Sequence, residues 1–157
     1  MAKKTTSLKP TATFTLAETL QQLEALGNAA VRKQNTKGGA GENQFGVKRG
    51  DLRTLANKIK TDHSLALELW DTGNIDAQFL ATLILQVDLL SGSQLERLVK
   101  SISYAWVADW LHSIVIKVHV DKETLREKWM ISKNRWTARA ARVAQNGRPA
   151  ERPDVQS

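Results

Sequence analysis

Two segments of the sequence combine residue types that can do chemistry. In the first, Asp109 follows Trp106 by three residues and precedes Trp110 directly. Because residues three or four apart share a face of a helix, a helix here brings a carboxylate beside two indole rings. Indole faces attract cations and a carboxylate supplies the counter-charge, so the segment is a candidate site for a cationic ligand. The alternative is that both tryptophans belong to the core and that Asp109 is a solvated or capping residue.

The second segment carries a row of arginines near the end of the chain. Arg135, Arg139 and Arg142 follow the spacing i, i+4, i+7, with Trp136 beside them. On a helix this spacing forms one stripe of guanidinium groups, which suits a row of phosphates. An exposed basic face without a partner is the alternative interpretation.

Charge along the chain is segregated. The chain has 157 residues and a net charge of +7, and residues 30–60 and 128–152 are basic whereas residues 61–99 are acidic. The first basic stretch contains Lys48 and Arg53, which we expect to contact phosphates together with the arginine stripe. A basic chain favours polyanionic partners, nucleic acid before a membrane surface, although solvated helix faces explain the same pattern.

The sequence argues against metal, nucleotide and thiol chemistry. It contains no cysteine, and His63, His112 and His119 match no metal-ligand spacing, so we expect no metal and no cofactor. His112 lies three residues after Asp109, so it is a candidate ligand or acid–base partner, with a satisfied surface histidine as the favoured alternative. The glycine-rich residues 36–46 lack the Lys-Ser/Thr of a phosphate-binding loop and predict a flexible basic loop.

The sequence shows no membrane-spanning segment and no secretory signal. No run approaches the roughly 20 apolar residues of a membrane-spanning helix, and the first ten residues lack the apolar core of a secretory signal. We therefore expect a cytoplasmic monomer that does not contact a membrane.

The apolar spacing predicts helices throughout the interior, where no proline occurs. A capping box at Thr15 and Glu18 starts the first helix, Asp51 caps the second, Asp76 starts another, and a capping box at Ser93 and Glu96 starts a further one. Other helices are expected at 64–70, 104–118, 122–130 and 134–144. The short connections predict an all-α fold of antiparallel helical pairs that form a HEAT-like α-α superhelix (solenoid), with a plain helical bundle as the alternative. We expect residues 13–145 to form this domain, flanked by a disordered basic N-terminus (1–12) and a disordered tail (146–157).

Several short motifs along the chain together resemble the DNA alkylation repair family, the DNA glycosylases built from HEAT-like repeats. They are Gln44-Phe-Gly-Val-Lys with Leu52-Arg53, Leu67-Glu-Leu-Trp70 with the following Gln78-Phe-Leu-Ala helix, the segment 104–111, and Trp136-x-x-Arg139-Ala-Ala. The resemblance covers roughly residues 20–144, little more than half of a typical member, so it implies a C-terminally truncated member.

The resemblance implies a curved solenoid whose concave basic face holds duplex DNA containing alkylated purines. Members remove N3- or N7-alkylated purines, and an Asp stabilises the developing oxocarbenium ion while Trp rings pack on the deoxyribose. Asp109 matches the Asp and Arg139 matches the Arg that contacts the DNA backbone.

The sequence departs from the family pattern at one tryptophan. The family shows Trp-Asp-x-x-Asp, whereas Ala105 stands four residues before Asp109 and the indole is shifted to Trp106, which we expect to reach the same cavity. Three functions follow as hypotheses: an alkylpurine DNA glycosylase with Asp109 and Trp106 as catalytic residues, a non-catalytic helical-repeat module that binds DNA or protein, and a protein–protein scaffold.

Overall fold

Nine α-helices and no strand make up residues 14–146, the part of the chain that the computed structural model describes. The expectation of an all-α fold is therefore confirmed for these residues. The predicted disordered ends lie outside the described residues, except for Asn146, which is the last residue of the last helix. The helices are α1 (Leu16–Ala25), α2 (Ala29–Lys37), α3 (Arg49–Ile59), α4 (His63–Asp71), α5 (Ile75–Ile84), α6 (Gly92–Lys100), α7 (Ala105–Ile114), α8 (Lys122–Met130) and α9 (Arg135–Asn146).

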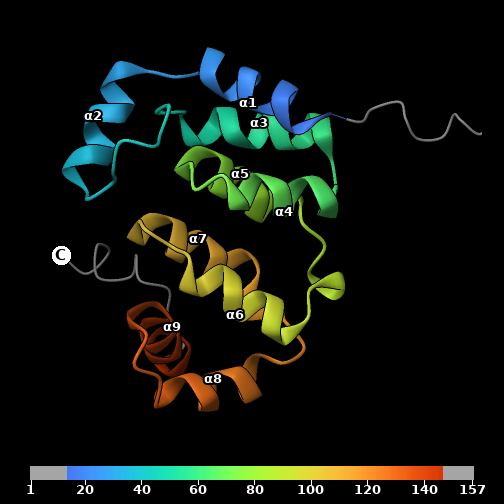
Figure 1. Ribbon diagram of the computed structural model, residues 1–157, viewed down its shortest axis with the longest axis vertical. Coiled ribbons are helices and arrows are strands. Elements are labelled where there is room, and N and C mark those ends of the chain that lie inside the picture. Colours follow the sequence, from blue (N-terminus) through green and yellow to red (C-terminus); the bar gives the residue numbers. More distant parts are fainter. Residues whose placement is uncertain (1–13, 147–157) are drawn as a thin grey trace, which may run out of the picture.

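The helices stack in chain order, with α1 at one end of the molecule and α8 and α9 at the other (Figure 1). Helix α4 packs against α5, and α8 packs against α9. Helices α3 and α7 both pack on α5, and α6 packs on α9. Each pair contacts mainly the next pair, which is the arrangement of a solenoid. Within residues 14–146 no helix is both long and apolar enough to cross a bilayer.

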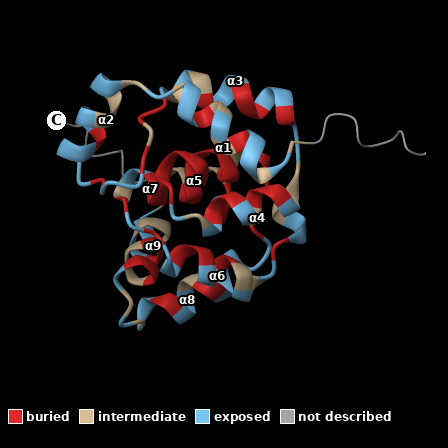
Figure 2. Cartoon of the chain, turned by 45° about the horizontal axis from the view of Figure 1, so that its top comes forward, coloured by how far each residue is buried: buried red, intermediate tan, exposed pale blue. Residues whose placement is uncertain are grey.

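Helix α5 is the centre of the hydrophobic core. All its residues except Leu83 are buried, and Figure 2 shows the helix buried along nearly its whole length. A helix that is buried on every side requires other elements to surround it. Because α3 and α7 pack on this buried support, α5 fixes their relative positions, and these two helices carry most of the site described below.

Two predicted helix starts are wrong, and at one of them the acidic residue has another role. Helix α3 begins at Arg49, two residues before Asp51, and Lys48 is its N-cap without a side-chain hydrogen bond. Helix α5 is capped by Asn74, whose side chain accepts from the Ala77 amide. Asp76, the predicted start, is instead fully buried and binds a neighbouring loop.

Helix α6 also starts earlier than predicted. The capping box is formed by Ser91 and Gln94, not by Ser93 and Glu96, and Glu96 binds groups on α6 and α8 instead. The motif at Thr15 and Glu18 is confirmed as a capping box.

One helix was not predicted, and another is shorter than predicted. Helix α2 is capped by Asn28, which accepts from the Val31 amide, and it runs into the expected glycine-rich loop as far as Lys37. The predicted helix 104–118 ends as an α-helix at Ile114, and a 3-10 turn, Ile116–Val118, follows it.

Candidate functional site

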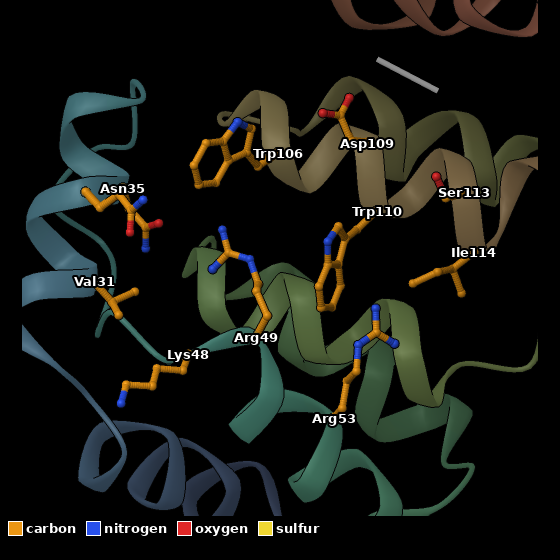
Figure 3. A pocket seen from close by; sticks show the side chains of 11 residues that line it. Val31, Asn35, Lys48, Arg49, Arg53, Trp106, Asp109, Trp110, Ser113 and Ile114 are labelled. Carbon is orange, nitrogen blue, oxygen red and sulfur yellow. The ribbon is translucent and has the colours of Figure 1, made fainter. Parts of the chain in front are cut away.

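A cleft of about 630 Å³ opens between α2, α3 and α7 (Figure 3). Its volume lies within the range typical of pockets that bind small ligands. One side is neutral, one is basic and one is aromatic and acidic. The lining residues are Val31, Gln34 and Asn35 of α2, Lys48, Arg49 and Arg53 at the start of α3, and Trp106, Asp109, Trp110, Ser113 and Ile114 of α7.

A tightly held loop sets the position of the basic side. Asp76 accepts hydrogen bonds from the backbone amides of Phe45, Gly46 and Val47, at 2.6, 3.1 and 2.9 Å. Gly46 has a φ of +80°, and a Cβ there would lie 2.6 Å from the carbonyl oxygen of Asn28, so only glycine fits. The Phe-Gly-Val motif therefore has a physical role: it fixes the chain that enters α3.

Arg49 occupies the aromatic part of the cleft. Its guanidinium carbon lies 4.1 Å from the ring centroid of Phe79, 5.3 Å from that of Trp106 and 6.0 Å from that of Trp110. Phe79 itself is fully buried and meets Trp110 edge to face, with centroids 4.9 Å apart. Figure 3 shows the Arg49 side chain directed from α3 toward the two indoles. We call these three rings the aromatic cage.

The surroundings of Arg49 have opposing effects on its charge. Burial lowers the pKa of Arg49, while the nearby Tyr104 and Asp76 act in the opposite direction. Burial likewise raises the pKa of the Tyr104 phenol. Because an arginine keeps its proton in proteins, Arg49 is a fixed positive charge within the cleft.

Lys48 and Arg53 add two exposed cations at the edges of the cleft. The Arg53 guanidinium lies 4.8 Å from the ring centroid of Trp110. Among residues 14–146, neither of them nor Arg49 forms a salt bridge. The structure therefore brings four of the predicted site residues into one cleft: Lys48, Arg53, Trp106 and Asp109.

Asp109 connects the cleft to α9. Arg139 donates from Nη2 to Oδ1 of Asp109 at 2.9 Å, and the two side chains are 24% and 15% exposed. In Figure 3 the carboxylate points away from Arg49. A charge-assisted hydrogen bond between partly buried groups is stronger than one at an exposed site, so it positions both residues.

The rest of the arginine stripe lies elsewhere. Arg135 and Arg142 are exposed on α9, but neither lines the cleft. Trp136 is buried, with the guanidinium of Arg135 4.5 Å from its ring centroid. Its ring therefore packs inside the protein, and the DNA contact expected of Trp136 stays a prediction.

Two further expectations are corrected or extended. His112 is buried, not at the surface. Arg49 was not among the predicted site residues. It lies four residues before the predicted Arg53 on the same helix face, and this spacing is the signal that could have identified it. No group of three or more His, Cys, Asp or Glu side chains within residues 14–146 is placed to hold a metal ion.

Comparison with known proteins identifies the relatives of this fold. The family model described as DNA alkylation repair enzyme matches residues 19–151. A solved structure described as "A new family of proteins related to the HEAT-like repeat DNA glycosylases with affinity for branched DNA structures" superposes with a TM-score of 0.76 at 29% identity. The alignment covers 82% of this chain and 55% of the solved one, so the chain spans about half the length of that relative.

No curated protein sequence matches the chain significantly. The structural match confirms the HEAT-like solenoid over the plain helical bundle. Because the family model covers most of the sequence and the fold agrees with it, the chain belongs to the DNA alkylation repair enzyme family.

Proposed function

We propose that this protein binds DNA in the cleft between α3 and α7 and prefers branched DNA to linear duplex. The observation that carries the proposal is the set of three cations, Lys48, Arg49 and Arg53, that line one cleft without a salt bridge among the described residues. Cations that form no salt bridge displace the counterions condensed on DNA when they meet its phosphates, which drives binding to nucleic acid.

The size of the cleft supports the preference for branched DNA. A volume of about 630 Å³ accommodates a group the size of a nucleotide, not a duplex. At a branch point the strands separate and bend, so a single phosphodiester segment reaches a narrow site more easily than in a continuous helix. The affinity for branched DNA of the 29%-identical relative supports the same proposal.

Fluorescence anisotropy at several salt concentrations tests this proposal with a four-way junction and a linear duplex of the same sequence. We expect tighter, salt-dependent binding to the junction. Equal affinity for the two DNAs would contradict the preference, and the absence of salt-dependent binding to either would favour the protein–protein scaffold instead.

Excision of alkylated purines is the second candidate function, and Asp109 is the observation in its favour. Its carboxylate lines the cleft between Trp106 and Trp110. An N3- or N7-alkylated purine is already a cationic leaving group, so the remaining task is to stabilise positive charge on the sugar. Asp109 is the residue for that role, Trp106 is the ring that would pack on the sugar, and Arg139 would contact the backbone after leaving Asp109.

The variant Asp109→Asn tests excision because it keeps the shape of the side chain and removes its charge. If the chain excises methylated purines, the rate should fall by about two orders of magnitude or more. Asp88→Asn, at an exposed position outside the cleft, is the matched control and should leave the rate unchanged. An Asp109→Asn variant that excises at the parent rate would assign Asp109 a structural role.

A further inference from the structure

The aromatic cage is already occupied by a cation that belongs to the protein. The guanidinium of Arg49 lies over Phe79 and beside the rings of Trp106 and Trp110, at centroid distances of 4.1, 5.3 and 6.0 Å. Phe79 is fully buried while Arg49 covers it, so this guanidinium forms the floor of the cleft where a bare ring would otherwise lie. A cage of three aromatic rings is a general recognition device for organic cations.

We propose that Arg49 plugs the aromatic cage, so that the cleft excludes cationic bases and accepts a phosphodiester in their place. Two physical effects carry the exclusion. The ring faces that would attract a cationic base already contact the guanidinium, and a second cation in the cage would lie within a few ångströms of a fixed positive charge.

The acceptance of an anion follows from the geometry of arginine. Its N–H groups lie in the plane of the guanidinium, so stacking on ring faces leaves the donors at the edge available for phosphate oxygens. Lys48 and Arg53 flank the same cleft and add positive charge to it. This half of the proposal rests on the DNA binding proposed above, whereas the exclusion of cations does not.

The proposal also separates the two candidate functions. An alkylated purine is a cation, so a plugged cage disfavours its entry into the cleft that excision would use. The Asp109 carboxylate accepts from Arg139 through Oδ1 and points away from Arg49. Arg49 is therefore a specificity-determining residue of the cleft.

Isothermal titration calorimetry with two nucleosides tests the plug directly on the full chain. The probes are 7-methylguanosine, in mildly acidic buffer where the methylated ring is cationic, and guanosine, which has nearly the same shape without the charge. The parent chain should bind neither. Arg49→Ala empties the cage. This variant should bind 7-methylguanosine at least about tenfold more tightly than the parent does, and at least about tenfold more tightly than it binds guanosine.

Three further variants separate the cage from general charge and from folding. Arg49→Lys keeps a cation over the rings and should behave like the parent. Lys58→Ala removes one exposed positive charge from the same helix outside the cleft and should leave the affinity for both nucleosides at the parent level. Arg49→Met keeps apolar cover on Phe79, so if the alanine variant does not fold, the methionine variant should still bind 7-methylguanosine more tightly than Arg49→Lys does.

The phosphate half is measured with the four-way junction. Arg49→Met should make the dependence of the logarithm of the affinity on the logarithm of salt less steep by about 0.9, the value for one lost phosphate contact, and Arg49→Lys should not. An unchanged slope in Arg49→Met would overturn this half. Equal binding of 7-methylguanosine by the parent and by a folded neutral variant would overturn the plug. Failure of the parent chain to bind any DNA would instead contradict the proposed function, while the nucleoside titrations would still decide the plug.

Discussion

The cleft and the contact between α6 and α8 hold their cations in opposite ways. In the second region, the Glu96 cluster, one carboxylate accepts from Lys100 and Lys128 at 2.9 Å each and from the Trp129 indole at 3.2 Å. These hydrogen bonds lower the pKa of Glu96 to about 2. In the cleft the cations lie over aromatic rings or at the edge of the site, and residues 14–146 provide no salt bridge for them.

The difference shows how one basic chain uses positive charge for two purposes. Cations that join helices are paired with a carboxylate of the protein, so they have less attraction left for an external anion. Cations over aromatic rings gain attraction from the ring faces but stay positively charged, and they are the ones that can neutralise phosphates. Net charge alone does not distinguish these groups; the contacts of each side chain do.

The largest expected effect on stability comes from the buried carboxylate beneath the cleft. Asp76→Asn replaces one of the two oxygens that accept from the amides of residues 45–47 by an amide group, which leaves a buried donor facing a donor. We expect the free energy of unfolding to fall by about 3 kcal/mol. Urea denaturation measures it, with Asp88→Asn at an exposed position as the control. A loss no larger than that of the control would mean that the loop does not depend on Asp76.

The next effect is on DNA affinity and tests whether the cations of the cleft are the ones that bind DNA. Lys48→Glu combined with Arg53→Glu should weaken junction binding by about one to two orders of magnitude and leave the thermal midpoint nearly unchanged, because both side chains are exposed. The matched control is Lys58→Glu with Lys117→Glu, two exposed lysines that do not line the cleft. An equal loss of affinity in the control would mean that binding follows net charge and not the cleft.

A smaller effect is expected for the acceptor of the Glu96 cluster. Glu96→Gln should lower the free energy of unfolding by about 1–2 kcal/mol near neutral pH, since both lysines are well exposed and solvent screens the pairs. Because the pKa of Glu96 is lowered from 4.5 to about 2 on folding, its contribution is present above pH 4.5 and is lost as the pH falls toward 2. Unfolding of the parent and the variant should therefore converge over that interval. A constant difference would exclude the carboxylate charge as its source.

The smallest effect is expected for a single cation of that cluster. Lys128→Gln removes one of the three donors to Glu96, and Lys128 is 64% exposed, so we expect a loss of about 0.5 kcal/mol or less. Junction affinity should stay at the parent value. A tenfold weaker affinity for the junction would show that the Glu96 cluster also contacts DNA, and the contrast between the two regions would then fail.

The elements that sequence patterns predicted well are those governed by local rules. The helix predicted at 122–130 coincides with α8, and Thr15 and Glu18 form the predicted capping box, because both depend on residues within one turn of each other. Two helix starts, at Asp76 and Glu96, failed where the acidic residue bonds to a distant partner instead. Asp76 binds the loop at residues 45–47, and no local pattern distinguishes such a carboxylate from a cap.

The candidate site was predicted in part for the same reason. Lys48, Arg53, Trp106 and Asp109 were named from residue type and family pattern, and they do line one cleft. Trp136 was named only as a neighbour of the arginine stripe. Its burial depends on the packing of α9 against α6 and α8, which spacing along the chain does not show.

The amino-acid sequence by itself determined the helical class, the segregation of charge and the family, because these depend on spacing within a few residues and on motifs in a fixed order. Only the tertiary structure decided which charges meet. Arg49 reaches Phe79 and Trp106 from distant points of the chain, and α5 brings them together by holding α3 and α7 on its surface. Ring faces, carboxylates and guanidinium groups act over a few ångströms, so their partners follow from the packing of helices and not from distance along the sequence.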